Sequence, residues 1–481
     1  MARFPTFWRG PSLSIVASYP QKRSLALPFH ELAASLASWP GACLLESGPG
    51  FGRWGRWSLF AAEPRLKFEM FDDAWTIHRQ DRSECGKTAG LERLARLLDE
   101  FDLAGQDFDP GDSSPFQGGM IGYVGYDLAP LLERLPRRSS ADSRLPDVSF
   151  GLFDTFVLID HLENKAKLQG FDLLGEGAAA VEARLDRWED RLRQKITPPI
   201  DPKLRPLRAE VSREAYGRSV SRALEYIAAG DVFQVNLSQR FSTEAETLID
   251  PRWIYERLKV RSPAPFSALI RLGDSAIVSA SPELFYSTEG SHIQTRPIKG
   301  TRPRGVSVAE DLRLSDELRA SPKDRAELTM IVDLERNDLG RVCRYGSVLV
   351  SENFAVESFA QVHHLVATVE GKLRPEVGPI DVLRALFPGG SITGAPKIRA
   401  MEIIDELEPN RRSAYTGAIG YFSRGGRSQF NIAIRTILVE ANRLSFQVGG
   451  GIVADSDPDA EYLETLDKAE GMRLAIEGGD A

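Results

Sequence analysis

Residues 295–305 read Thr-Arg-Pro-Ile-Lys-Gly-Thr-Arg-Pro-Arg-Gly and place Lys299 close to three arginines, Arg296, Arg302 and Arg304. A lysine that acts as a nucleophile must be neutral, whereas a free lysine side chain has a pKa of about 10.4. Neighbouring positive charges and burial are the usual means of lowering that pKa. The stretch therefore indicates either a nucleophilic lysine or a basic loop that binds an anion. Motifs elsewhere in the chain are needed to decide between the two.

The composition is that of an ordinary globular enzyme. Of the 481 residues, 42% are hydrophobic and 27% are charged, fractions typical of folded domains. The net charge of -8 argues against nucleic acid as the main partner. No apolar run approaches the roughly 20 residues that cross a membrane, and the N-terminus lacks the continuous apolar core of a signal peptide. We therefore expect a cytoplasmic protein.

A proline-rich segment divides the chain. Residues 197–206 read Thr-Pro-Pro-Ile-Asp-Pro-Lys-Leu-Arg-Pro, and prolines suppress both helix and sheet. We expect a strand-rich N-terminal region over residues 1–196, a linker over 197–209 and a second region over 210–475. Residues 50–55 imitate a dinucleotide-binding glycine motif, but tryptophans and arginines crowd the turn, so a nucleotide site is not expected there.

Two predicted helices begin with paired carboxylates. Each starts with a capping residue followed by proline, at residues 321–322 and 457–458. The first helix then presents Asp324 and Glu327 on one face, and the second presents Glu461, Glu464 and Lys468. Either pair alone is typical of helix capping. Two pairs together could hold a hard cation such as Mg²⁺, which binds few carboxylates, keeps its waters and adds a substrate oxygen.

Three further segments indicate an anion-binding pocket. A strand predicted over residues 430–438 places Asn431, Ala433 and Arg435 on one face. The glycines at 449–451 let backbone N–H groups approach a carboxylate. Residues 232–241 alternate as a half-buried strand, with Phe233 on the apolar face and Gln234 on the polar face. Residues 389–397 do not form a phosphate loop, because alanine and proline stand where Lys-Ser/Thr is required.

These residues resemble the chorismate-utilising enzymes, and most closely the branch that aminates chorismate at C4. The resemblance is densest in long, ordered blocks: Gly230–Phe241, Ser281–Gly305, Ser321–Gly346, Phe387–Phe422 and Phe430–Met472. It implies an α+β fold in which two large antiparallel sheets pack as an interwoven sandwich with helices outside. The site would lie between the sheets, in the part built mainly after residue 210.

The resemblance also implies residue roles. Lys299 matches the nucleophile, Glu283 the general acid that helps the C4 hydroxyl leave, and His364 the active-site histidine. The positions that match the substrate pocket are Gln234, Thr301, Thr393, Tyr415, Arg435, Gly449, Gly450, Gly451 and Lys468. Glu327 and Glu464 match the magnesium ligands, with Asp324 and Glu461 as supporting acids.

Two positions separate the branches of this family. Members that add water to chorismate carry a lysine base where Gln234 stands, and glutamine cannot deprotonate water. Anthranilate synthases resemble this chain too, but typically have alanine where Lys299 stands. The resemblance therefore implies amination of chorismate to 4-amino-4-deoxychorismate, for p-aminobenzoate and folate synthesis. The alternatives are an anthranilate synthase component I and, in another class, a non-catalytic subunit that binds chorismate or tryptophan.

The resemblance extends to a partner and to a regulatory ligand. Similar proteins bind tryptophan through a Leu-Leu-Glu-Ser segment, which Glu46 and Ser47 match here, together with a segment matched by Pro265 and Phe266. Phe266 and Ser267 depart from the usual residues, so tryptophan binding stays open. The three cysteines are too scattered for a disulfide frame or a zinc site, and none lies in the glycine-flanked turn of a glutaminase nucleophile. We therefore expect ammonia to come from a separate glutamine amidotransferase subunit.

Overall fold

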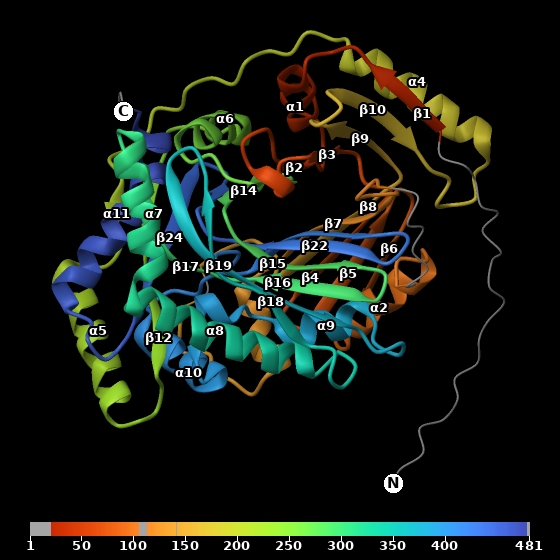
Figure 1. Cartoon of the computed structure of the whole chain (residues 1–481). Helices are drawn as coiled ribbons and strands as arrows, with labels where there is room; N and C mark the ends of the chain where they lie inside the picture. The colour runs from red at the N-terminus through yellow and green to blue at the C-terminus, as the bar shows by residue number, and fades with distance from the viewer. Residues whose placement is uncertain (1–20, 105–112, 141, 479–481) are drawn as a thin grey trace.

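The computed structural model describes residues 21–104, 113–140 and 142–478. Two large antiparallel sheets form its centre (Figure 1). In spatial order, the first sheet contains β1 (Gln21–Leu25), β10 (Lys165–Gly170), β9 (Thr155–Asp160), β3 (Trp57–Ala61), β2 (Cys43–Glu46), β13 (Phe266–Leu272), β14 (Ser275–Ser281), β23 (Thr436–Glu440), β24 (Arg443–Ile452), β12 (Gln234–Glu244) and β11 (Arg208–Ala209), and β20 (Gly394–Ala395) also pairs with β12.

The second sheet has the same number of strands. In spatial order it contains β17 (Ile298–Pro303), β19 (Val362–Lys372), β16 (His292–Arg296), β15 (Leu284–Glu289), β22 (Arg427–Ile432), β21 (Ala418–Ser423), β7 (Gly119–Val124), β8 (Val148–Phe153), β4 (Leu66–Phe71), β5 (Ala74–Arg79) and β6 (Ser83–Gly86), and β18 (Leu349–Ser358) pairs with β19. The predicted α+β class with two antiparallel sheets is confirmed.

Strands from both halves of the sequence alternate within each sheet. In the first sheet β2 pairs with β13, which puts Leu44 opposite Leu269. In the second sheet β7 pairs with β21, which puts Gly122 opposite Gly420. A side chain at Gly122 would stand 1.9 Å from the Ser149 carbonyl oxygen, so glycine is required there for the strands to approach. Neither sheet could form from one half alone, although the sequence division at 197–209 remains a prediction.

The helices cover the outer faces of the sheets. Figure 1 shows α8 and α9 beside the second sheet, and α6 and α11 beside the first. The helices are α1 (Phe29–Ala37), α2 (Gly90–Glu100), α3 (Ala129–Leu132), α4 (Ala178–Leu192), α5 (Arg213–Ala228), α6 (Pro251–Arg261), α7 (Val308–Ala320), α8 (Pro322–Gly340), α9 (Pro379–Leu386), α10 (Lys397–Leu407) and α11 (Pro458–Glu477), with short 3-10 turns η1 (Gly52–Trp54), η2 (Tyr126–Leu128) and η3 (Gly390–Ile392). No helix in the described ranges is both long enough and apolar enough to cross a membrane.

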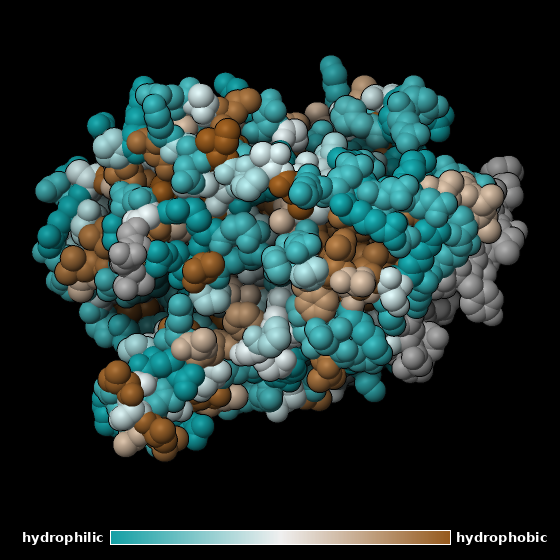
Figure 2. Space-filling model, turned by 90° about the horizontal axis from the view of Figure 1, so that it is seen from above, coloured by the Kyte–Doolittle hydropathy of each residue, from teal (hydrophilic) through white to brown (hydrophobic). Residues whose placement is uncertain are grey.

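Hydrophobic packing joins the two sheets. The largest buried cluster contains Ile277 from the first sheet and Phe430 from the second, so the sandwich encloses one continuous core. A separate cluster packs α5 and α10 against Val235 and Leu237 of β12. The hydrophilic face in Figure 2, interrupted by small hydrophobic patches, agrees with the charged fraction of the sequence.

One predicted strand face differs from the structure. Phe233 precedes β12 and is 74% exposed, whereas Gln234 is fully buried. The alternation correctly put Val235 and Leu237 on one face of the strand and Gln234 on the other. Both faces are covered, however, one by helices and one by the interior of the sandwich. A polar residue on a buried face needs a functional or structural partner.

Candidate active site

Lys299 lies in β17 at one end of the second sheet and is partly buried. Its Nζ donates a hydrogen bond to the Ser391 carbonyl oxygen at 3.2 Å. Burial lowers the pKa of Lys299 below its usual value, Lys468 acts in the same direction, and Glu327 and Glu283 oppose the change. A partly desolvated amine with a lowered pKa is the form that a nucleophilic lysine requires.

The three nearby arginines do not produce this effect, which corrects the prediction from the sequence. Arg296 pairs with Glu352 and Glu357, Arg302 pairs with Glu317 and Asp324, and Arg304 pairs with Asp311. Each positive charge is therefore balanced by a carboxylate of its own. The proximity of residues in sequence indicated the correct direction for the Lys299 pKa, but burial and a lysine from a distant helix are the causes.

Glu283 lies just before β15 and is only 4% exposed. Burial raises the pKa of its carboxyl group from 4.5 to about 7, and Lys299 opposes part of that rise. The Ile298 backbone N–H, next to the lysine, approaches the Glu283 Oε1 at 3.4 Å. A carboxyl group with a pKa near neutrality can donate a proton at physiological pH, which is the property expected of a general acid.

His364 is buried in β19 and contacts the same strand as the lysine. Its Nδ1 and the Thr301 Oγ1 are 2.9 Å apart. Burial lowers the pKa of His364 to about 3, and the nearby charge of Arg435 acts in the same direction. The imidazole is therefore neutral at pH 7 and can serve as a hydrogen-bonding group in the site.

Arg435 occupies a crossover between the two sheets, which corrects the predicted strand over residues 430–438. The chain leaves the second sheet after Ile432 and enters the first at Thr436. Arg435 has a φ of 50° in this connection, a left-handed conformation that is uncommon for a non-glycine residue. Among the residues described, its guanidinium has no hydrogen bond or ion pair, and burial lowers its pKa. A half-buried guanidinium without a protein partner fits a bound carboxylate.

The glycines at 449–451 lie in β24, opposite β12. Gly451 pairs with Asn236, and a side chain at Gly451 would stand 2.2 Å from the Gln234 Nε2. The Gln234 Nε2 donates to the Asn236 Oδ1 at 3.1 Å, whereas the Gln234 Oε1 is buried without a hydrogen bond. Glycine at 451 is therefore required for the Gln234 amide to lie against β24, and the unsatisfied amide oxygen of Gln234 can accept a hydrogen bond from a ligand.

Thr393 and Tyr415 are both buried and held by backbone contacts. The Thr393 Oγ1 donates to the Gly389 carbonyl oxygen at 2.9 Å, and the Thr393 carbonyl accepts from the Asn236 N–H at 2.8 Å. The Tyr415 ring lies 5.7 Å from the Arg412 guanidinium carbon. Burial raises the pKa of Tyr415, so its hydroxyl keeps its proton.

The two predicted acidic helix starts interact electrostatically, and their role as a metal site stays a prediction. Ser321 and Asp457 cap α8 and α11 through their side chains. Burial raises the pKa of Glu327, and Lys299 and Lys323 oppose that rise. Asp324 and, less strongly, Glu464 add to it, so the charges of the two helix starts interact. The Glu464 Oε1 pairs with the Lys468 Nζ at 2.7 Å, and the same Nζ donates to the Gly449 carbonyl at 2.9 Å.

The chemistry of this acidic group fits a hard cation. The Glu461 Oε1 accepts from the Ser456 hydroxyl at 2.6 Å, while its Oε2 is buried without a hydrogen bond. A side chain at Gly450 would stand 3.0 Å from that Oε2 and 3.4 Å from the Glu464 Oε1, so the glycine keeps the space open. In the described ranges no three potential ligands already stand at metal-binding distances. Magnesium needs only one or two carboxylates when waters and a substrate oxygen complete its shell.

Sequence reasoning missed two residues that build the pocket wall. The Ser391 carbonyl accepts hydrogen bonds from both Lys299 and Asn236, at 3.2 and 2.7 Å. The buried Arg412 donates to the carbonyls of Ile392 and Asn236, at 3.0 and 2.9 Å. A backbone carbonyl has no side-chain signature in a sequence. Gly390 was a usable signal, because a side chain there would stand 2.6 Å from the Leu334 Cδ2 and would prevent the turn before Ser391 from packing against α8.

The residues of the predicted tryptophan pocket lie together at the edge of β2 and β13. Ser267 pairs with Glu46 in the sheet, and the Phe266 ring lies 5.6 Å from the Trp54 ring. The Glu46 carboxylate is already bound by the Tyr255 hydroxyl at 2.5 Å and the Lys259 ammonium at 2.9 Å. An amino-acid ligand that needed this carboxylate would have to displace the lysine.

Comparison with known proteins places this geometry in a family. Residues 53–473 match the model of the chorismate binding enzymes. The chain belongs to that family. It is 42% identical to aminodeoxychorismate synthase component 1 of Klebsiella aerogenes over 462 residues, 94% of this chain and 98% of that protein. It is also 40% identical to anthranilate synthase component 1 of Thermus thermophilus over 447 residues, 92% of this chain and 93% of that protein.

A solved structure supports the same assignment. Anthranilate synthase component I from Streptococcus pneumoniae superposes with a TM-score of 0.77 at 33% identity, covering 89% of this chain and 93% of the other. Relatives with two different names therefore share this fold at similar identity. The choice between their activities depends on individual residues of the site.

Proposed function

We propose that this enzyme is an aminodeoxychorismate synthase component I, which converts chorismate and ammonia to 4-amino-4-deoxychorismate. The observation that carries the proposal is the pair formed by Lys299 and Glu283. A lysine with a lowered pKa and a glutamic acid with a pKa near 7 interact electrostatically with each other. This pairing supplies a nucleophile and an acid at the same pH.

The residues divide the reaction into two displacements. The neutral amine of Lys299 attacks C2 of chorismate while the C4 hydroxyl leaves as water, taking the proton of Glu283. Ammonia then attacks C4, and the electron shift expels the lysine from C2. The carbonyl of Ser391 accepts a hydrogen bond from the Lys299 Nζ at 3.2 Å and so orients the amine.

Charge on the substrate sets the remaining roles. Chorismate carries two carboxylates, and the guanidinium of Arg435 with the hydroxyl of Tyr415 would bind one of them. Glu327 and Glu464, supported by Asp324 and Glu461, would hold Mg²⁺ for the other. That ion would neutralise substrate charge in the pocket. Neutral His364, linked to Thr301, would donate or accept a hydrogen bond without adding charge.

Gln234 and Lys299 argue against two rival activities. A water-adding enzyme needs a base where the neutral Gln234 stands. In an anthranilate-type enzyme the Lys299 amine would have no catalytic role. Burial of this lysine destabilises its charged form, and a cost of that kind is expected where the neutral amine is used. The component I naming of the relatives further supports a partner subunit, and we propose a glutamine amidotransferase that supplies ammonia.

Mass spectrometry provides the test. The purified chain with chorismate, Mg²⁺ and an ammonium salt should form aminodeoxychorismate, and anthranilate as the product would contradict the proposal. Without ammonia, the intact protein should gain the mass of chorismate minus water, mapped to the peptide that contains Lys299.

Variants of the lysine sharpen this test. Lys299→Arg should form no adduct, because guanidinium stays charged and cannot attack. Lys299→Ala should lose the adduct and still bind chorismate. Aminodeoxychorismate formation by the alanine variant at the parental rate would show that Lys299 binds an anion only.

A further inference from the structure

The turn that contains Ser391 is bonded to β12 on both sides of Ile392. The Ser391 carbonyl accepts from the Asn236 side chain at 2.7 Å, and it also accepts from the Lys299 Nζ at 3.2 Å. The Thr393 carbonyl accepts from the Asn236 N–H at 2.8 Å. The position of the carbonyl that binds Lys299 therefore depends on the contacts between η3 and β12.

Arg412 supplies the contact between these two bonds. Its Nη1 donates to the Ile392 carbonyl at 3.0 Å, and its Nη2 donates to the Asn236 carbonyl at 2.9 Å. One guanidinium thus binds the backbone of η3 and the backbone of β12 next to Ser391. The planar fork of an arginine can serve two separate acceptors in this way, whereas a lysine has its donors on a single nitrogen.

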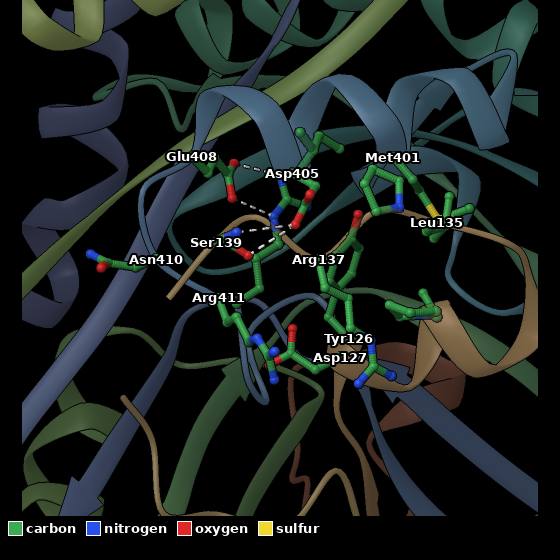
Figure 3. A pocket seen from close by; sticks show the side chains of 15 residues that line it. Tyr126, Asp127, Leu135, Arg137, Ser139, Met401, Asp405, Glu408, Asn410 and Arg411 are labelled. Atoms are coloured by element: carbon green, nitrogen blue, oxygen red, sulfur yellow. Dashed lines mark hydrogen bonds and ion pairs between the residues drawn. The ribbon is translucent and has the colours of Figure 1, made fainter. Parts of the chain in front are cut away.

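The other donors of Arg412 are used as well. Its Nε and Nη2 donate to the two carboxylate oxygens of Glu408, at 2.9 and 2.7 Å, and its Nη1 also donates to the Thr416 Oγ1 at 3.3 Å. A guanidinium has five N–H groups, so each of them has an acceptor here. Figure 3 shows Glu408 and Tyr126 beside a recess that they help to line, and the Tyr126 ring lies 4.8 Å from the guanidinium carbon.

This arrangement is buried and balanced in charge. Arg412 is 2% exposed and Glu408 is 5% exposed. Glu408 also accepts from the Ser238 N–H and hydroxyl, at 2.7 and 2.8 Å. A buried ion pair is costly to desolvate and often adds little stability compared with apolar side chains of similar size. Apolar side chains could not, however, supply the two hydrogen bonds to the carbonyls of Ile392 and Asn236.

We propose that Arg412 is a positioning residue, which fixes η3 against β12 and so holds the Ser391 carbonyl where it orients the Lys299 amine. The inference rests on the proposed function, because it takes Lys299 as the nucleophile. A misplacement of about 1 Å can lower the rate of a reaction about a hundredfold. Other residues are assigned to the carboxylates of chorismate, so loss of the Arg412 contacts should slow attack on C2 more than it weakens binding.

Arg412→Lys tests the proposal, because it keeps the charge opposite Glu408 and loses the fork that reaches both carbonyls. With chorismate and no ammonia, intact mass of quenched samples gives the rate of adduct formation. We expect that rate to fall at least about tenfold. In the Lys299→Ala background, where no adduct forms, Arg412→Lys should change the calorimetric Kd for chorismate by less than about threefold.

Arg240→Lys is the matched control. Arg240 is also a buried arginine of β12, and it pairs with Asp142 and Glu210. Its replacement should leave the rate of adduct formation within about twofold of the parental rate. An equal loss of rate in Arg240→Lys and Arg412→Lys would mean that a general loss of stability explains the effect, and it would overturn the proposal.

Amide hydrogen exchange gives a measurement that does not depend on the reaction. Peptides that contain Asn236 and Thr393 should exchange at least about threefold faster in Arg412→Lys than in the parent, and the Thr393 peptide should be unchanged in Arg240→Lys. If Arg412→Lys does not fold, the same measurements use the double variant Glu408→Gln, Arg412→Gln. That variant removes both buried charges together, which a protein interior tolerates better than the loss of one.

The possible results separate this proposal from the proposed function. Adduct formation by Arg412→Lys at the parental rate, or parental exchange in both peptides, would show that Arg412 does not position the site. A parent enzyme that forms no adduct would instead refute the nucleophilic role of Lys299. Exchange in the Asn236 and Thr393 peptides would then still decide whether Arg412 holds η3 against β12.

Discussion

Replacing Glu283 by glutamine should stabilise the protein at high pH while abolishing turnover. The folded-state pKa of this buried carboxyl is about 7 against 4.5 in its usual surroundings. A rise of this size corresponds to about 3 kcal/mol, at about 1.4 kcal/mol per pKa unit. Since the folded pKa is raised, the protonated form stabilises the fold below pH 4.5. That contribution is lost as the pH increases through 7.

Glutamine has the same shape and no charge, so the penalty of a buried carboxylate disappears in Glu283→Gln. The variant should be more stable than the parent by about 3 kcal/mol at pH 8.5, and by under about 1 kcal/mol at pH 5. Urea unfolding followed by tryptophan fluorescence at the two pH values measures the difference. Glu246→Gln, at an exposed position, is the control and should show no pH-dependent gain. A gain for Glu283→Gln that is equal at both pH values, or negative at pH 8.5, would refute the reasoning.

Three further predictions concern the site and its surroundings. The kcat/KM for chorismate should fall above pH 7 as Glu283 loses the proton that it must donate, and a profile that stays flat to pH 8.5 would contradict that role. Gly450→Ala should raise the Mg²⁺ concentration for half-maximal activity about tenfold, because the methyl group would stand 3.0 Å from the Glu461 Oε2. Gly340→Ala, whose new side chain would meet nothing within 4 Å, is the matched control and should leave that concentration unchanged. Free tryptophan should bind weakly, since Glu46 is already paired with Lys259 at 2.9 Å, and a calorimetric Kd below about 10 µM would contradict this expectation.

Local sequence signals predicted the parts of the site that lie within one element. The caps at Ser321 and Asp457 and the carboxylates one turn later follow from short-range rules, and both helices begin where those rules place them. The alternation of the strand from Gln234 correctly placed Val235 and Leu237 under α5 and α10, but it did not predict that Phe233 is exposed or that Gln234 is buried. The fold class itself came from resemblance, because strand order in sheets of this size depends on pairings hundreds of residues apart.

Features that depend on long-range contacts escaped prediction. Arg435 looked like a strand residue, because β22 and β23 are separated by only three residues. The left-handed φ at Arg435 is imposed by the passage between sheets, which no local pattern records. In the same way, ion pairs with Glu352, Glu317 and Asp311 balance the charges of the arginines near Lys299, and these partners come from β18 and α7.

The two sheets explain why the site can hold neutral and charged groups together. Lys299 lies in β17 of the second sheet and Glu283 lies just before β15 of the same sheet, while Gln234 and Gly451 come from the first. Burial between the sheets moves the Lys299 pKa downward and the Glu283 pKa upward, so both neutral forms gain at the same pH. If the Glu283 carboxyl transferred its proton to the Lys299 amine, both groups would be charged. Glu283 could then no longer donate a proton to a leaving hydroxyl, and Lys299 could no longer attack as a nucleophile. Desolvation of Glu283 therefore has two consequences: it lowers the stability of the fold at high pH, and it keeps the acid neutral so that it can donate a proton. Glu283→Gln separates them, because it removes the destabilising charge together with the proton donor and keeps the shape of the side chain.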